Sequence, residues 1–253
     1  MAAKKIIPCL DMKDGRVVKG VNFVDLKDIG SPPQLAEDYS NQGADEVAFL
    51  DLAASLEGRQ TTLRLVSETS KRVSVPFTVG GGIRNTDDVG EVLNAGADKV
   101  SINTAAIGNP DIISESAERF GRHRIVIAID AKMVGGRWEV VTHGGTRSAG
   151  LEVVEWAKKV EDLGAGEILL TSVDADGVKD GYDIPLNKAV ADEVDIPVTA
   201  SGGCGKIEDF YEVFSQTDVA SALAASAFHY KLFTIGEVKE YLKDMGVPVR
   251  WPN

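Results

Sequence analysis

The sequence is poor in cysteine, in histidine and in aromatic residues. Its 253 residues include only Cys9 and Cys204, too few for a disulfide framework, so we expect a reducing compartment, the cytoplasm. The three histidines are scattered without metal-ligand spacing, which predicts no metal site. Neither a dinucleotide-binding glycine fingerprint nor a P-loop occurs, so we also expect no nucleotide cofactor.

Basic charge and long apolar runs are scarce as well. Lys and Arg number 27 against 39 Asp and Glu, and the net charge of −12 disfavours binding to nucleic acid or to an anionic membrane. No segment approaches the roughly 20 apolar residues of a membrane span, and the apolar part of the N-terminus is too short for a signal peptide. Phosphorylated small molecules are not excluded, because glycine turns and helix N-termini can hold phosphate without a basic surface.

Short apolar runs alternate with amphipathic stretches along the whole chain. The predicted strands are Lys5–Leu10, Glu46–Asp51, Pro76–Val79, Lys99–Ile102, Ile125–Asp130, Glu167–Thr171, Pro197–Ala200 and Ala220–Ala224. Between them lie helical patterns such as Leu151–Leu163, with apolar residues on one face. Eight such units in about 250 residues predict an α/β fold, a single (β/α)8 TIM barrel over residues 1–253. An open doubly wound sheet is the alternative.

The sequence also repeats itself at about half its length, which favours the barrel. Similar segments begin at Gly43 and Gly164, at Thr78 and Thr199, and at Leu10 and Ile129. We therefore predict two half-barrels, approximately residues 1–121 and 122–253. The two longest connections, residues 16–33 and 132–150, follow strand ends on the face where barrel active sites lie. The second contains Val-Gly-Gly-Arg and predicts a small hairpin.

Asp11 and Asp130 are the first candidate site residues. Each ends an apolar strand, and the repeat places them at equivalent positions of the two half-barrels. Carboxylates in a barrel mouth can exchange protons with a substrate that lies between them. The alternative is that each aspartate only caps a turn.

Glycine-rich turns follow the strands of both halves. Gly80–Gly82 comes after the third strand and Gly202–Gly205 after the seventh. Glycine lets the backbone approach an anion closely, and a following helix presents free N–H groups to it. Two such turns on opposite sides of the mouth predict a bisphosphate substrate, unless the glycines serve only as tight turns.

Four charged residues are predicted at the other end of the barrel. Because side chains two apart on a strand share a face, counting back from the mouth places Lys5, Glu46, Lys99 and Glu167 inside the barrel floor. Buried charges need partners, so we expect a ring of salt bridges. The ring either plugs the floor or forms a gate for something small.

Several segments together resemble the cyclase subunits of imidazole glycerol phosphate synthase. They include IIPCLDMKDGRVVKGVNF, FTVGGGIR, GADKVSINTAA, VAIDAK, GAGEILLTSVDADG, TASGG and LAASAFH, and the resemblance covers nearly the whole chain. It implies a lyase of histidine biosynthesis that converts the bisphosphate PRFAR and ammonia to imidazole glycerol phosphate and AICAR. It further implies a heterodimer with a glutamine amidotransferase (glutaminase) subunit that supplies the ammonia.

The resemblance also assigns roles to residues. Asp11 and Asp130 are the acid/base pair, and Lys5, Glu46, Lys99 and Glu167 form the ammonia gate. Predicted substrate- and phosphate-binding residues are Lys19, Gly82, Asn103, Thr104, Thr171, Asp176, Gly177, Gly203, Ala225 and Ser226. Lys19 lies on the connection 16–33, which resembles the family's mobile lid, although it can equally be a solvated lysine.

The chain departs from the family pattern in three places. Asp51-Leu-Ala-Ala-Ser55 stands for the usual DITAS, Val178 replaces a threonine, and the segment Ser215–Asp218 is one residue longer than usual. Two alternative functions stay open. One is the sister isomerase that precedes the cyclase, which shares both aspartates and both glycine turns but needs no ammonia. The other is a non-catalytic barrel that serves as a scaffold for the glutaminase.

Overall fold

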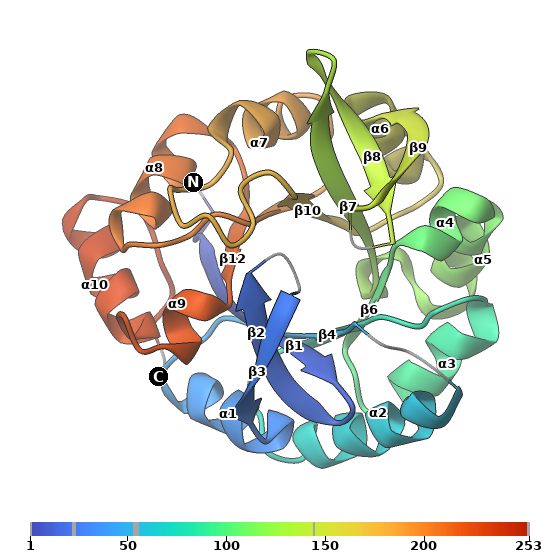
Figure 1. Cartoon of the computed structure of the whole chain (residues 1–253), viewed down its shortest axis with the longest axis horizontal. Helices are drawn as coiled ribbons and strands as arrows, with labels where there is room; N and C mark the ends of the chain where they lie inside the picture. The colour runs from blue at the N-terminus through green and yellow to red at the C-terminus, as the bar shows by residue number, and fades with distance from the viewer. Residues whose placement is uncertain (1, 22–23, 53–55, 144, 252–253) are drawn as a thin grey trace.

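A closed barrel of parallel strands forms the centre of the molecule (Figure 1). The computed structural model describes residues 2–21, 24–52, 56–143 and 145–251. The barrel strands are β1 (Lys5–Lys13), β4 (Val47–Asp51), β5 (Phe77–Gly80), β6 (Lys99–Ile102), β7 (Ile125–Val134), β10 (Glu167–Ser172), β11 (Val198–Ser201) and β12 (Ser221–Ala224). Each pairs in parallel with the next, and the pairs β7–β10 and β12–β1 complete the circle. The predicted (β/α)8 barrel is confirmed, and the open sheet is excluded.

Helices surround the barrel on all sides (Figure 1). They are α1 (Pro32–Asn41), α2 (Leu56–Thr69), α3 (Thr86–Asn94), α5 (Asp111–Phe120), α6 (Val153–Asp162), α7 (Ile184–Ala191), α8 (Glu208–Gln216) and α10 (Ile235–Asp244). Two short helices, α4 (Thr104–Gly108) and α9 (Ser226–His229), and a 3-10 turn, η1 (Arg122–Arg124), complete the set in the described ranges. None of these helices is long and apolar enough to cross a membrane.

Local sequence signals account for the helix ends. The Asn85 side chain accepts a hydrogen bond from the Asp88 backbone N–H at 2.9 Å and so begins α3, as its sequence position predicts. The helix predicted over 151–163 begins only at Val153, because Leu151 and Glu152 belong to a strand. In the unusual segment Ser215–Asp218 before β12, α8 ends at Gln216, and the Thr217 hydroxyl donates to the Val213 carbonyl at 2.6 Å.

Two apolar layers hold the barrel together. The larger one lies between strands and helices, where the rings of Phe49 and Phe77 meet edge to face at 4.6 Å. A smaller one fills the barrel interior and consists of Ile7, Cys9, Ala48, Val126, Leu169 and Leu223. The alternation of side chains along each strand therefore divides the apolar residues between the outside and the inside of the barrel.

Two antiparallel ribbons extend from the carboxyl ends of β1 and β7. The connection 16–33, for which the sequence predicted no strands, contains the antiparallel strands β2 (Arg16–Val21) and β3 (Val24–Gly30). The predicted hairpin is confirmed, and it joins β7 to β8 (Arg137–Thr142), which pairs with β9 (Arg147–Glu152). Gly135 and Gly136 have φ of 59° and 87°, the left-handed values that a two-residue hairpin turn requires.

A buried ion pair ties α10 to the start of the barrel. Lys239 Nζ lies 2.8 Å from Asp45 Oδ1 and 2.8 Å from the Arg250 carbonyl oxygen. The second carboxylate oxygen of Asp45 accepts the Ile6 backbone N–H at 2.8 Å. The two side chains are only 2% and 5% exposed, so each charge depends on the other and on these backbone groups.

Lys239→Ala is expected to lower the free energy of unfolding by about 3 to 5 kcal/mol, because Asp45 would stay buried without its cation. Denaturant unfolding followed by circular dichroism measures the change. Lys188→Ala is the control: its ion pair with Asp192 is exposed on α7, and we expect little change. Equal effects of the two substitutions would contradict the assignment of stability to the buried pair.

Candidate active site

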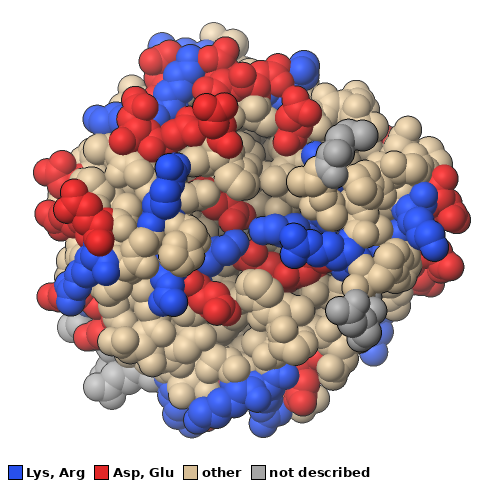
Figure 2. Space-filling view, turned by 180° about the vertical axis from the view of Figure 1, so that it is seen from behind, with Lys and Arg blue, Asp and Glu red and all other residues tan. Residues whose placement is uncertain are grey.

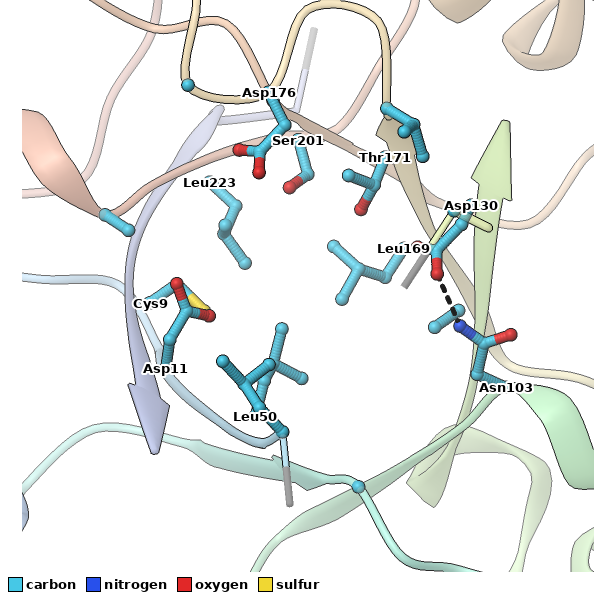
Figure 3. A pocket seen from close by; sticks show the side chains of 18 of the residues that line it. Cys9, Asp11, Leu50, Asn103, Asp130, Leu169, Thr171, Asp176, Ser201 and Leu223 are labelled. Atoms are coloured by element: carbon cyan, nitrogen blue, oxygen red, sulfur yellow. Dashed lines mark hydrogen bonds between the residues drawn. The ribbon is translucent and has the colours of Figure 1, made fainter. Parts of the chain in front are cut away.

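A cavity of about 1060 Å³ opens at the carboxyl ends of the barrel strands. Asp11 and Asp130 lie on opposite walls of this cavity, on β1 and β7 (Figure 3). The strand pairing places Leu50 beside Asp11 and Thr171 beside Asp130. The two predicted acid/base residues therefore face one space from two sides.

Asp11 is buried at the end of the interior cluster. The thiol of Cys9, two residues earlier on the same face of β1, donates a weak hydrogen bond to Asp11 Oδ1 at 3.7 Å. Figure 3 shows the sulfur directly beside the carboxylate. Cys9 itself is 1% exposed, so one side of Asp11 is closed to water.

Asp130 is held by Asn103. The Asn103 side-chain amide donates to Asp130 Oδ2 at 2.9 Å, across the β6–β7 pair (Figure 3). Burial raises the pKa of Asp130 to about 6; the Asn103 hydrogen bond lowers this pKa and the neighbouring charge of Asp176 raises it. Asp130 can therefore gain or lose a proton near neutral pH, as proton transfer to or from a substrate requires.

The glycine turns of both halves line the same cavity. The predicted binding residues that the structure brings there are Gly82, Asn103, Thr104, Thr171, Asp176, Gly177, Gly203, Ala225 and Ser226. Thr104 and Ser226 are the first residues of the short helices α4 and α9. Gly203 has a φ of 104°, and a Cβ atom there would overlap the Gly181 carbonyl oxygen, so this close backbone approach needs glycine.

Some residues of this region either lie outside the described part of the chain or were not predicted from the sequence. Lys19 lies on β2 opposite Lys27 of β3, but its side chain is outside the described part of the chain, as is Ser55. Val178 is 52% exposed at the rim beside Gly177. Lys13 and Lys132 also line the cavity, and sequence reasoning missed them. Counting two residues onward from each aspartate could have found both.

The four charged residues of the predicted ring do come together at the opposite end of the barrel. Lys99 Nζ lies 2.7 Å from both Glu46 Oε2 and Glu167 Oε2. Lys5 Nζ lies 3.7 Å from Glu46 Oε2, and no ion pair joins Lys5 to Glu167 among the described residues. The arrangement is thus an open arc of three ion pairs rather than a closed ring.

Threonines complete the arc. The Thr78 hydroxyl donates to Glu46, and the Thr199 hydroxyl donates to Glu167 at 2.7 Å. Burial alone would lower the pKa of Lys99, but Glu46 and Glu167 together raise it above its ordinary value, so Lys99 stays charged. Figure 2 shows the face of the molecule at this end, where acidic and basic side chains lie next to one another around the centre.

The fold and the cavity define a (β/α)8 barrel with its polar groups gathered where barrel enzymes have their active sites. No cluster of metal-ligating side chains occurs in the ranges that the structure describes. The family of histidine biosynthesis proteins matches residues 5–234 of the sequence. The chain belongs to this family, which includes both the cyclase and the isomerase of the pathway.

The pKa of Asp130 provides a test of the site's electrostatics. We expect its carboxyl carbon to titrate at about pH 6 in a ¹³C NMR experiment. Asn103→Ala removes a hydrogen bond to the charged form and should raise this pKa, whereas Asp176→Asn removes a neighbouring negative charge and should lower it. A shift in the opposite direction for either variant would refute the cause assigned to that residue.

Proposed function

We propose that this protein is the cyclase of its family, a lyase that converts PRFAR and ammonia to imidazole glycerol phosphate and AICAR. The observation that carries the proposal is the arc of Lys5, Glu46, Lys99 and Glu167 beneath the cavity. Burying such charges costs desolvation energy, and apolar side chains would often make the floor at least as stable, so stability alone does not account for the layer. An isomerase that uses no ammonia has no need of it.

The mouth of the barrel fits the bisphosphate. The glycine turns after β5 and β11, with the first residues of α4 and α9, offer backbone N–H groups on opposite sides of one cavity. A molecule held at both phosphates would lie over Asp11 and Asp130, which act as general acid and general base on the bonds between them. No metal or cofactor enters this proposal.

The interior of the barrel fits the passage of ammonia. Between the floor and the cavity lie the apolar side chains of Ile7, Val126, Leu169 and Leu223 with the small residues Cys9 and Ala48. Neutral ammonia can cross such a layer, whereas ammonium would lose the hydration of its charge. The glutaminase partner of the proposed heterodimer would therefore dock on the face shown in Figure 2 and deliver ammonia at the arc. The two buried free cysteines fit a cytoplasmic location.

The sister isomerase is the second candidate, because the two aspartates and the glycine turns serve it equally well. A non-catalytic scaffold for the glutaminase is the third, and the intact Asp11–Asp130 pair speaks against it. Two assays of the purified protein separate the three, one with PRFAR and ammonium salts and one with the precursor of PRFAR. The cyclase consumes PRFAR, the isomerase converts only the precursor, and the scaffold converts neither.

Asp11→Asn and Asp130→Asn should each lower ammonium-dependent consumption of PRFAR by about 10²- to 10⁴-fold, the usual loss when a general acid or base is removed. The decrease in substrate absorbance measures the rate. Circular dichroism of each variant should be unchanged, because the backbone pairing of β1 and β7 with their neighbours does not depend on these side chains. Near wild-type turnover in one variant would remove that aspartate from the mechanism.

Lys99→Ala should impair glutamine-dependent turnover by at least about ten-fold while ammonium-dependent turnover falls much less. Ammonia from the solution can enter through the open mouth, but ammonia from the partner must pass the arc, where the two glutamates would lose their shared cation. The two rates are compared in the complex with the glutaminase, with Lys188→Ala on the outer surface as control. An equal loss in both assays would argue against a gate.

A further inference from the structure

Two lysines occupy equivalent places above the two aspartates. Lys13 follows Asp11 by two residues on β1, and Lys132 follows Asp130 by two residues on β7. Residues two apart on a strand point to the same side, so both lysines share the face of the aspartates. Both line the cavity, one step further out towards solvent than Asp11 and Asp130.

Lys132 is not neutralised by its cross-strand neighbour. Glu139 of β8 stands opposite Lys132 in the antiparallel pair. However, the Glu139 carboxylate already accepts hydrogen bonds from Arg137 at 2.8 and 3.0 Å and from the Ser148 hydroxyl at 2.7 Å. Within the described ranges Lys132 forms no ion pair, and its ammonium group is available to the cavity.

Lys13 is in the corresponding situation. Its cross-strand neighbour on β2 is Arg16, a like charge, and the Arg16 guanidinium is itself paired with Asp28 of β3 at 3.0 Å. No ion pair of Lys13 occurs in the part of the chain that the structure describes. In both half-barrels the charged residues of the ribbon thus pair with one another, and the lysine beside the mouth forms no ion pair among the described residues.

The cavity needs such cations if it is to hold a bisphosphate. Five carboxylates line it, those of Asp11, Asp51, Asp130, Asp174 and Asp176. Backbone N–H groups supply only partial positive charge against these carboxylates and two phosphates. The third lining lysine, Lys179, lies over the Tyr230 ring at 5.5 Å. Among the described lysines that line the cavity, Lys13 and Lys132 have neither an ion pair nor a ring contact.

The strand order assigns each lysine to one side of the mouth. β7 pairs with β6, whose end leads into Thr104, whereas Ser226 follows β12, three strands away in the other direction, so Lys132 stands nearer to Thr104 than to Ser226. β1 pairs with β12, whose end leads into Ser226, whereas Thr104 follows β6, three strands away in the other direction, so Lys13 stands nearer to Ser226 than to Thr104. The lysine of each half-barrel therefore stands nearer to the short helix of the other half than to that of its own.

We propose that Lys132 and Lys13 are substrate-binding residues, each of which donates to one of the two phosphates of the substrate: Lys132 on the Thr104 side and Lys13 on the Ser226 side. This inference deepens the proposed function and rests on it for the identity of the bisphosphate. The binding of inorganic phosphate tests the role of the two lysines independently of the proposed function.

The first experiment uses inorganic phosphate and the backbone amide signals of Thr104 and Ser226 in NMR titrations. Lys132→Met should weaken phosphate binding at Thr104 about ten-fold, the loss of one charge-assisted hydrogen bond, and leave Ser226 unchanged. Lys13→Met should show the reverse. Lys132→Arg should keep most of the affinity, and Lys188→Met on α7 is the matched control.

Unchanged affinities, or an equal loss at both turns from either variant, would overturn the inference. Phosphate that perturbs neither turn in the wild-type protein would overturn it together with the glycine turns as anion sites. If each variant loses phosphate affinity only at its predicted turn but the wild-type protein does not consume PRFAR, the lysine assignment stands and the cyclase proposal is rejected.

The second experiment measures PRFAR turnover with ammonium salts. Each Lys→Met variant should raise KM about ten-fold with kcat changed by less than about two-fold, because the lost contact binds substrate and transition state alike. A fall in kcat with KM unchanged would assign the lysine to the chemical step and refute the binding role. Normal KM and kcat in both variants would refute the inference while the cyclase stands.

Discussion

The parallel pairing of β10 with β7, and of β12 with β1, is the constraint on which the arrangement of this protein depends. Once the strands close, every second side chain points into a space with only two open ends. A polar group on that face must lie at the mouth or at the floor, because the interior between them is packed with apolar side chains. On β1, this one rule places Lys5 at the floor, Cys9 in the middle and Asp11 at the mouth.

The half-barrel repeat is kept at the mouth but broken at the floor. Glu46 with Thr78 and Glu167 with Thr199 form two equivalent carboxylate–hydroxyl pairs, each pair separated from the other by 121 residues in sequence. Strand register places Lys99 beside Thr78, while Ser221 takes the same place beside Thr199. Lys99 therefore bridges Glu46 and Glu167, and one lysine lies between these two glutamates where exact two-fold symmetry would place two.

Much of this architecture could be predicted from the sequence, because it follows from local patterns. All eight strands occur where apolar runs predict them, and alternation along the strands brings the floor residues together. The ribbon of β2 and β3 was not predicted, since residues 17–29 contain no Asn-Gly or Asp-Gly pair. The Asn103 bond to Asp130 and the Lys239 pair with Asp45, which join residues 27 and 194 positions apart, leave no pattern in the sequence.

Burial shifts the pKa of charged groups at both ends of the barrel, but the direction of the net shift depends on the partners of each group. At the mouth, Asp130 has one amide donor and a carboxylate neighbour, so burial prevails and its pKa rises to about 6. At the floor, Lys99 has two carboxylates within 2.7 Å, which outweigh burial and raise its pKa instead. The same closed barrel thus contains a carboxyl group that exchanges its proton near neutral pH and an ammonium group that keeps its own. Proton transfer is possible where the cavity opens, whereas the charged groups of the floor stay paired with one another.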